Sequence, residues 1–196
     1  MLSPHTLSRL GQRTLVLTLL IFQPPGNAAA LTIEDVTFPD TISIEDQQIP
    51  LRGAALLRWL SIFKVYVAAL YLPEMENTQD VLAEDIPKRL EISYLVSIDG
   101  PDFGKGAEAI LERNLSADEL AHLRTRIDKL NAVYRKVKPG DRYALTYVPG
   151  KGTELSYNGR PLINIEGADF AAAYFAIWLG SDPIDQDMRN QLVKGG

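Results

Sequence analysis

The chain has no cysteine and only two histidines among its 196 residues. Without cysteine there is neither a disulfide framework nor a thiol for lipid attachment. His122 is the one histidine beyond the first thirty residues, and it lies off the apolar stripe of its predicted helix. A histidine metal site or a Ser/His/Asp triad needs more than this, so His122 is interpreted as a surface residue and no cofactor is expected.

An excess of basic charge is also absent, since 20 Lys and Arg stand against 25 Asp and Glu. A surface that binds nucleic acid needs a basic stripe. The nearest candidate, the basic residues between 124 and 138, is interleaved with apolar residues and is interpreted as the solvated face of a helix. No nucleic-acid partner is therefore expected.

The apolar run 14–22 is too short to cross a bilayer, which takes about 20 residues. Arg9 and Arg13 precede it, and the small residues 28–30 follow a Pro-Pro-Gly breaker. This order is typical of a secretory signal peptide. We therefore expect residues 1–30 to be a signal peptide cleaved after Ala30, and residues 31–196 to be one periplasmic domain with no membrane span.

Hydrophobic periodicity predicts an α+β domain of antiparallel strands with a layer of helices on one side. Residues 58–72 are the most apolar and β-prone stretch, and they are predicted to form a single central strand buried on both faces, with Arg58 at its entrance. The other predicted strands are 31–39, 42–51 with a turn at 46–48, 88–98, 142–148, 153–157 and 160–165. Helices are predicted over 79–83, from 100, from a capping box at Ser116 and Glu119 to 137, over 169–179, and from a cap at Asp185.

Few residues offer chemistry. The glycine-containing segment 100–106 follows a strand and opens a helix, but its spacing does not fit a phosphate-binding loop. The paired carboxylates lie in predicted turns and caps. What remains is Arg58, Lys64 and the tyrosines, set among apolar neighbours. Arg58 either pairs with an Asp or Glu of the protein or binds an anion at the mouth of an apolar pocket.

The order of several short motifs resembles the bacterial chalcone isomerase-like family, in the superfamily that includes fatty-acid-binding proteins. The motifs are 52–58 (RGAALLR), 63–72 (FKVYVAALYL), 139–143 (PGDRY), 167–170 (GADF) and 177–180 (IWLG). The resemblance implies an open-faced β-sandwich, in which a large antiparallel sheet carries a layer of helices with a ligand cleft between them.

The resemblance also implies positions for the cleft residues. The isomerase's arginine, which holds the substrate's phenolate, matches Arg58, and its strand threonine matches Tyr66. The cleft tyrosine, the asparagine that follows it and the last cleft hydroxyl match Phe103, Asn114 and Ile177. Because Phe103 and Ile177 lack the hydroxyl, and losing one such donor costs a hundredfold or more in rate, the chain is not expected to be an efficient chalcone isomerase.

Three functions stay open at this stage. The first is a non-catalytic exported protein that binds an apolar carboxylate, such as a fatty acid, in a cleft near Arg58, with Lys64, Tyr66, Phe103, Asn114 and Ile177 as further ligand-binding residues. The second is an isomerase or intramolecular lyase that uses Tyr66 and Lys64 on an enone-type substrate. The third is a structural or partner-binding protein with a filled cleft. A straight strand would hold Arg58 and Tyr66 about 26 Å apart, so a shared site requires a bend near 59–61.

Overall fold

A computed structural model describes residues 30–74 and 81–194. The predicted signal peptide lies outside the described residues except for Ala30, and so does the start of the helix predicted over 79–83; residues 81–83 are not helical. Within the described part of the chain, none of the helices has the length and apolar character needed to cross a membrane.

The sheet has seven antiparallel strands whose spatial order follows the chain, so each strand pairs with the next. This order needs only local connections, apart from the helical excursion between the fourth and fifth strands of the sheet. The strands are β3 (Thr41–Ile44), β4 (Gln47–Trp59), β5 (Phe63–Tyr71), β6 (Lys88–Tyr94), β7 (Arg142–Val148), β8 (Gly152–Tyr157) and β9 (Arg160–Ile165).

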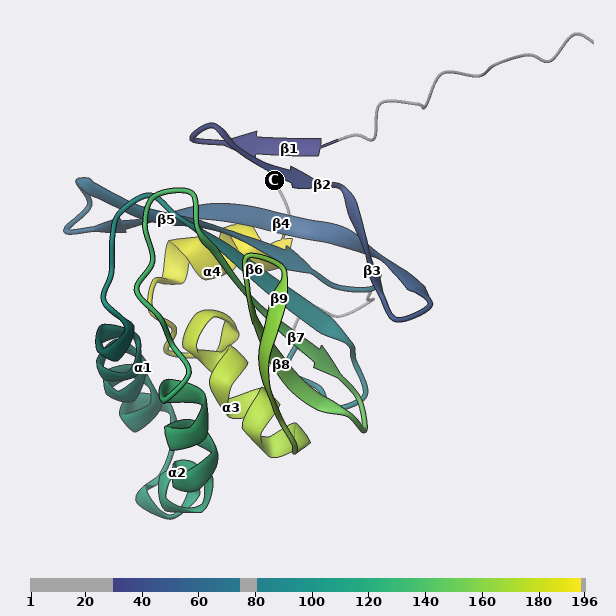
Figure 1. The fold of residues 1–196 in the computed structure, drawn as a ribbon. Helices are drawn as coiled ribbons and strands as arrows, with labels where there is room; N and C mark the ends of the chain where they lie inside the picture. Colours follow the sequence, from purple (N-terminus) through teal and green to yellow (C-terminus); the bar gives the residue numbers. More distant parts are fainter. Residues whose placement is uncertain (1–29, 75–80, 195–196) are drawn as a thin grey trace, which may run out of the picture.

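Helices cover one face of this sheet, and a small hairpin packs on the other (Figure 1). The helices are α1 (Gly100–Asn114), α2 (Ala117–Asn131), α3 (Ala168–Leu179) and α4 (Gln186–Lys194), and the hairpin is β1 (Ala30–Ile33) with β2 (Val36–Pro39). The α+β prediction of a large antiparallel sheet with a layer of helices on one side is confirmed.

Strand β5 is buried on both faces, as its sequence predicts. Tyr66 and Leu70 belong to the core under the helices, whereas Val67 and Tyr71 belong to a smaller core that is closed by Phe38 of β2. The period of two along the strand thus divides its side chains between two apolar layers. Arg89, Glu91 and Arg142 form an ion-pair network beside the smaller core.

The prediction of a single central strand over 58–72 is wrong. Arg58 is the second-last residue of β4 and lies opposite Lys64 of β5, because the chain reverses between Trp59 and Phe63. Leu60 and Ser61 both have positive φ, 51° and 59°, and the Ile62 N–H donates to the Trp59 carbonyl at 3.2 Å. These are the features of a type I′ turn. The turn supplies the bend that a site shared by Arg58 and Tyr66 requires.

Other boundaries also differ from the sequence prediction. The strand predicted over 31–39 is the β1–β2 hairpin, with Glu34 and Asp35 in the left-handed region, and the turn before β4 falls at 45–46. β6 ends at Tyr94 rather than at 98. The second helix stops at Asn131, although its apolar pattern continues to 137; Val137 instead forms a β-bridge with Ile98.

Signals carried by specific side chains are confirmed. Ser116 and Glu119 form both halves of the capping box of α2. The Asp185 carboxylate accepts from the Met188 N–H at 2.7 Å at the start of α4. The hairpin between β8 and β9 turns at Asn158 and Gly159, both with positive φ.

Candidate ligand cavity

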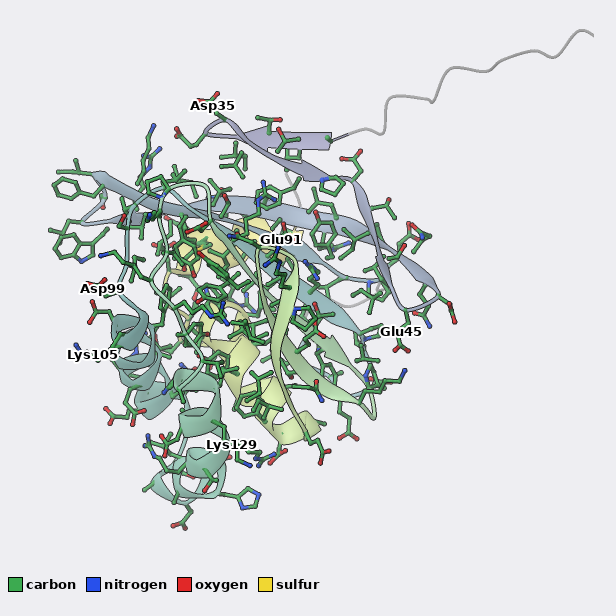
Figure 2. The ribbon with its side chains drawn as sticks, viewed as in Figure 1. Asp35, Glu45, Glu91, Asp99, Lys105 and Lys129 are labelled. Carbon is green, nitrogen blue, oxygen red and sulfur yellow. The ribbon has the colours of Figure 1, made fainter. Side chains whose placement is uncertain are left out.

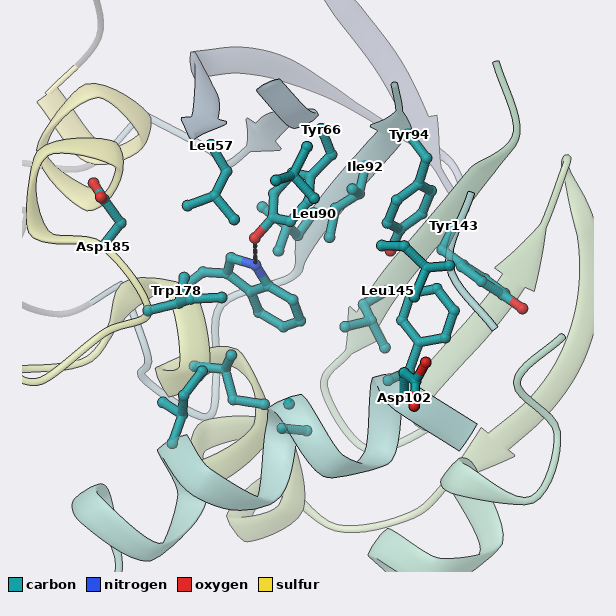
Figure 3. A pocket seen from close by; sticks show the side chains of 18 of the residues that line it. Leu57, Tyr66, Leu90, Ile92, Tyr94, Asp102, Tyr143, Leu145, Trp178 and Asp185 are labelled. Atoms are coloured by element: carbon teal, nitrogen blue, oxygen red, sulfur yellow. Dashed lines mark hydrogen bonds between the residues drawn. The ribbon is translucent and has the colours of Figure 1, made fainter. Parts of the chain in front are cut away.

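A cavity of about 480 Å³ lies between the sheet and helices α1 and α3 (Figure 3). Its volume falls within the range of small-molecule sites, about 300 to 1,000 Å³. The lining comes from five strands, two helices and the segments next to them: Leu57, Arg58, Trp59, Val65, Tyr66, Leu90, Ile92, Tyr94, Val96, Ile98, Asp102, Phe103, Gly106, Ala107, Ile110, Tyr134, Tyr143, Leu145, Leu155, Tyr174, Ile177, Trp178, Ile184 and Asp185.

The cavity interior is apolar and aromatic, and its charged groups are at the rim. Leu90, Ile92 and Leu145 project from the sheet, since alternate residues of neighbouring strands share a face. Asp102 and Asp185 line opposite sides of the cavity in Figure 3. Asp102 is ion-paired with Lys105 at 2.8 Å, and Asp185 caps α4.

One wall is a cluster of aromatic rings. Phe103 stacks on Tyr134 with a centroid separation of 4.8 Å and meets Tyr143 edge to face at 5.5 Å. The hydroxyls of this wall are bonded within the protein: Tyr134 bonds to Tyr174 at 3.0 Å, and Tyr143 donates to the Arg135 carbonyl at 3.1 Å. This wall therefore presents mainly the surfaces of aromatic rings to a ligand, and fewer polar groups.

Two buried hydroxyls differ from these. Tyr66 accepts a hydrogen bond from Trp178 Nε1 at 2.9 Å, which leaves its own proton to donate (Figure 3). The Tyr94 hydroxyl makes no hydrogen bond within the described residues and belongs to a cavity-lining side chain. Burial raises the pKa of both phenols well above its ordinary value. Both stay protonated at neutral pH, so they act as donors and not as bases.

Next to the cavity-lining Arg58, one carboxylate is ion-paired with two cations. Glu34 of the β1–β2 turn pairs with Lys64 Nζ at 2.5 Å, and its other oxygen is 3.7 Å from the Arg58 guanidinium. The Arg58 side chain is 42% exposed, so this is a surface pair and not a buried one. Arg58 thus has an acidic partner in the protein, but the three groups together keep a net charge of +1.

The structure brings four of the six predicted site residues to one cavity, namely Arg58, Tyr66, Phe103 and Ile177. Lys64 is not among the lining residues, and its ammonium donates to Glu34 of the β1–β2 turn. Asn114 is away from the cavity, where its amide donates to the carbonyls of Ile110 and Asp182 at 2.9 and 2.7 Å. The bond to Asp182 joins the end of α1 to the segment before α4.

The sequence alone does not mark Tyr94 and Trp178 as site residues. Tyr94 lies on the buried face of β6, and the alternation of apolar residues along that strand is the available signal. Trp178 comes from α3, whose nearly continuous apolar sequence hides which side faces the sheet. Among the described residues, there is no group of three or more His, Cys, Asp or Glu side chains that could hold a metal ion.

The antiparallel sheet, the helical layer and the apolar cavity between them define a two-layer α+β domain with an internal cavity. The chain matches the chalcone isomerase-like family over residues 30–194 and belongs to that family.

One solved structure extends the comparison of folds. The crystal structure of a fatty-acid binding protein of Arabidopsis thaliana superposes with a TM-score of 0.66 at 14% sequence identity, covering 85% of this chain and 96% of the plant chain. At that identity the likeness concerns the fold alone. No curated protein sequence matches the chain.

Proposed function

We propose that this protein binds an apolar monocarboxylate, such as a fatty acid, without transforming it. The observation that carries the proposal is the cavity: about 480 Å³ enclosed chiefly by aliphatic and aromatic side chains, with its few free polar groups at defined points. Such a space suits an acyl chain or a ring with one polar end. The similar fold of the plant fatty-acid binding protein supports the same class of ligand.

Arg58 is the proposed partner of the carboxylate. Its distance of 3.7 Å to Glu34 exceeds hydrogen-bond range, whereas Lys64 bonds that carboxylate directly. The guanidinium therefore keeps its donors for a second anion, and planar guanidinium groups bind carboxylates through two parallel hydrogen bonds. Tyr66 and Tyr94 offer further neutral donors deeper in the cavity.

The polar groups of the cavity support binding over catalysis. Phe103 and Ile177 line it with no hydroxyl where the isomerase pattern has one. The raised pKa values of Tyr66 and Tyr94 leave no phenolate to act as a base near pH 7. An enone isomerase is the alternative, and robust conversion of a chalcone to one flavanone enantiomer would establish it over the proposal.

The test compares Arg58→Ala with Lys136→Ala, a control that removes a surface cation paired with Asp99 away from the cavity. Calorimetric titration with sodium laurate below its micelle concentration is expected to show about 10- to 100-fold weaker binding for Arg58→Ala and no change for the control. Methyl laurate, which has no charge, should bind wild type and Arg58→Ala alike. Equal laurate affinity in all three proteins would remove Arg58 from the site, and no binding to wild type would favour a structural or partner-binding protein with a filled cleft.

We also propose that the protein acts in the periplasm after removal of residues 1–30. The order of charged, apolar and small residues in that segment supports export. Intact-mass measurement of protein from the periplasmic fraction should give a chain that begins at Leu31, and a mature chain that still carries Arg9 and Arg13 would contradict this.

A further inference from the structure

The turn between β4 and β5 carries an unusual concentration of exposed apolar side chains. Trp59, Leu60, Ile62 and Phe63, here called the hairpin tip, are 63%, 65%, 72% and 57% exposed. The β4–β5 hairpin extends beyond the rest of the sheet, and its side chains point outward at the end (Figures 1 and 2). Single exposed apolar residues are ordinary, but four within five positions mark an interaction surface.

Folding does not explain these residues. Leu60 has φ 51° and Ser61 has φ 59°, a conformation that is unfavourable for a residue with a Cβ atom and in which Asn-Gly is preferred. The chain keeps a large apolar side chain at a position where Asn or Gly would stabilise the turn. Trp59 and Phe63 contact each other, with ring centroids 6.1 Å apart, and so form one contiguous apolar surface.

The hairpin tip is continuous with the cavity. Trp59 belongs to both, and Arg58 lines the cavity immediately before it. Val96 and Ile184, which are exposed and also line the cavity, add to its apolar rim. A ligand with low solubility in water could therefore pass between an apolar phase and the cavity without crossing bulk solvent.

We propose that the hairpin tip inserts into the surface of an anionic phospholipid bilayer and opens the cavity toward the lipid. A projecting turn requires no matching groove in a bilayer, whereas a protein partner would have to supply one. Trp is favoured at the level of the lipid headgroups, and two cations, Arg58 and Lys64, flank the tip; among the described residues, Glu34 is the carboxylate that is ion-paired with them. The membrane as the source of the ligand rests on the proposed function, but insertion of the tip does not.

The experiment is co-sedimentation of the mature chain, residues 31–196, with vesicles of phosphatidylcholine and phosphatidylglycerol in a 7:3 ratio. The double variant Leu60→Ser/Ile62→Ser changes two tip residues that do not line the cavity, and Leu31→Ser is the matched control on β1, where the leucine is 38% exposed. Wild type and Leu31→Ser should bind alike, and the double variant should bind at least about tenfold more weakly, since two partly exposed aliphatic side chains no longer leave water.

Brominated lipid identifies the inserted residue. It should quench part of the tryptophan fluorescence of wild type, and this quenching should disappear in Trp59→Phe, which still sediments with vesicles. No binding by wild type, equal binding by the double variant, or quenching unchanged in Trp59→Phe would overturn the proposal. A wild-type dimer that the double variant dissociates, seen by analytical ultracentrifugation, would instead assign the tip to self-association. Laurate titration without vesicles tests the proposed function separately, and the double variant should bind laurate like wild type.

Discussion

Lys88 at the start of β6 is a charged residue outside the cavity that is only 1% exposed. Its ammonium donates to the Ala83 carbonyl at 2.8 Å and lies 5.1 Å from the ring centroid of Tyr147. Burial lowers the pKa of Lys88 to about 8, although Asp85 opposes the shift. Lys88 is charged in water but is held among aromatic rings in the folded protein. The free energy of unfolding therefore depends on pH.

Between pH 8 and 10, the unfolded chain keeps a proton on Lys88 that the folded chain has lost, so this residue should make stability rise with pH. The folded pKa of about 8 and the ordinary lysine pKa of 10.5 give a contribution of about 2 kcal/mol over this range. The buried tyrosines act in the opposite direction toward pH 10, because burial raises the pKa of their hydroxyls and the unfolded chain loses those protons first. Urea unfolding of wild type and Lys88→Met at intervals of half a pH unit isolates the lysine contribution as the difference between the two proteins. A difference that stays constant between pH 8 and 10 would contradict the displaced titration of Lys88.

The hydroxyls of Tyr66 and Tyr94 form a matched pair for substitution by Phe. Tyr66→Phe removes the acceptor of Trp178 Nε1 and should lower the free energy of unfolding by about 1 to 2 kcal/mol. Tyr94→Phe removes a hydroxyl with no partner among the described residues, so the ligand-free protein should be equally or more stable. Thermal unfolding without ligand separates the two, and equal losses would show that Tyr94 has a partner of its own.

At the scale of the element, the two hairpins explain what the sequence could and could not reveal. Asn158-Gly159 predicts a type I′ turn directly, because both residues accept positive φ, and this turn predicts the β8–β9 hairpin. Leu60 and Ser61 adopt the same conformation without turn-forming residues, so an unbroken apolar alternation from 58 to 72 predicts one strand. The single strand over 58–72 is therefore predicted wrongly at a turn whose residues contribute little to folding.

This difference leads to an element-scale prediction about the turn. Leu60→Asn with Ser61→Gly would give β4–β5 the preferred type I′ sequence and should raise the free energy of unfolding by about 1 kcal/mol. Ser61→Gly alone should give part of that gain. If the hairpin tip serves binding, the Leu60→Asn/Ser61→Gly variant should be more stable than wild type and lose vesicle binding. Ser61→Gly should keep its part of the gain in stability and still bind vesicles. A double variant that is less stable than wild type would show that Leu60 supports the fold.

At the scale of the whole molecule, the layered architecture followed from periodicity and turn signals, whereas the composition of the cavity did not. Tyr94 and Tyr143 meet Phe103 only because β6 and β7 are paired and α1 packs across them. Arg58 reaches the same cavity through a turn that the periodicity concealed. Contacts between distant segments depend on register and packing, and the periodicity and turn signals of a single sequence do not reveal these.

The cavity lowers the stability of the whole molecule in favour of binding, because the space that would admit a ligand is space that core side chains do not fill. Ala107 of α1 is 8% exposed and lines the cavity, and Ala109 on the same helix is exposed. Ala107→Leu should extend an aliphatic side chain into the empty volume, raise the free energy of unfolding by about 1 to 2 kcal/mol and weaken laurate binding at least about tenfold. Ala109→Leu, which adds the same atoms at the surface, should change neither. Urea unfolding and calorimetric titration of both variants would decide the point: if Ala107→Leu stabilised the protein and still bound laurate like wild type, the acyl chain would have to lie outside this cavity.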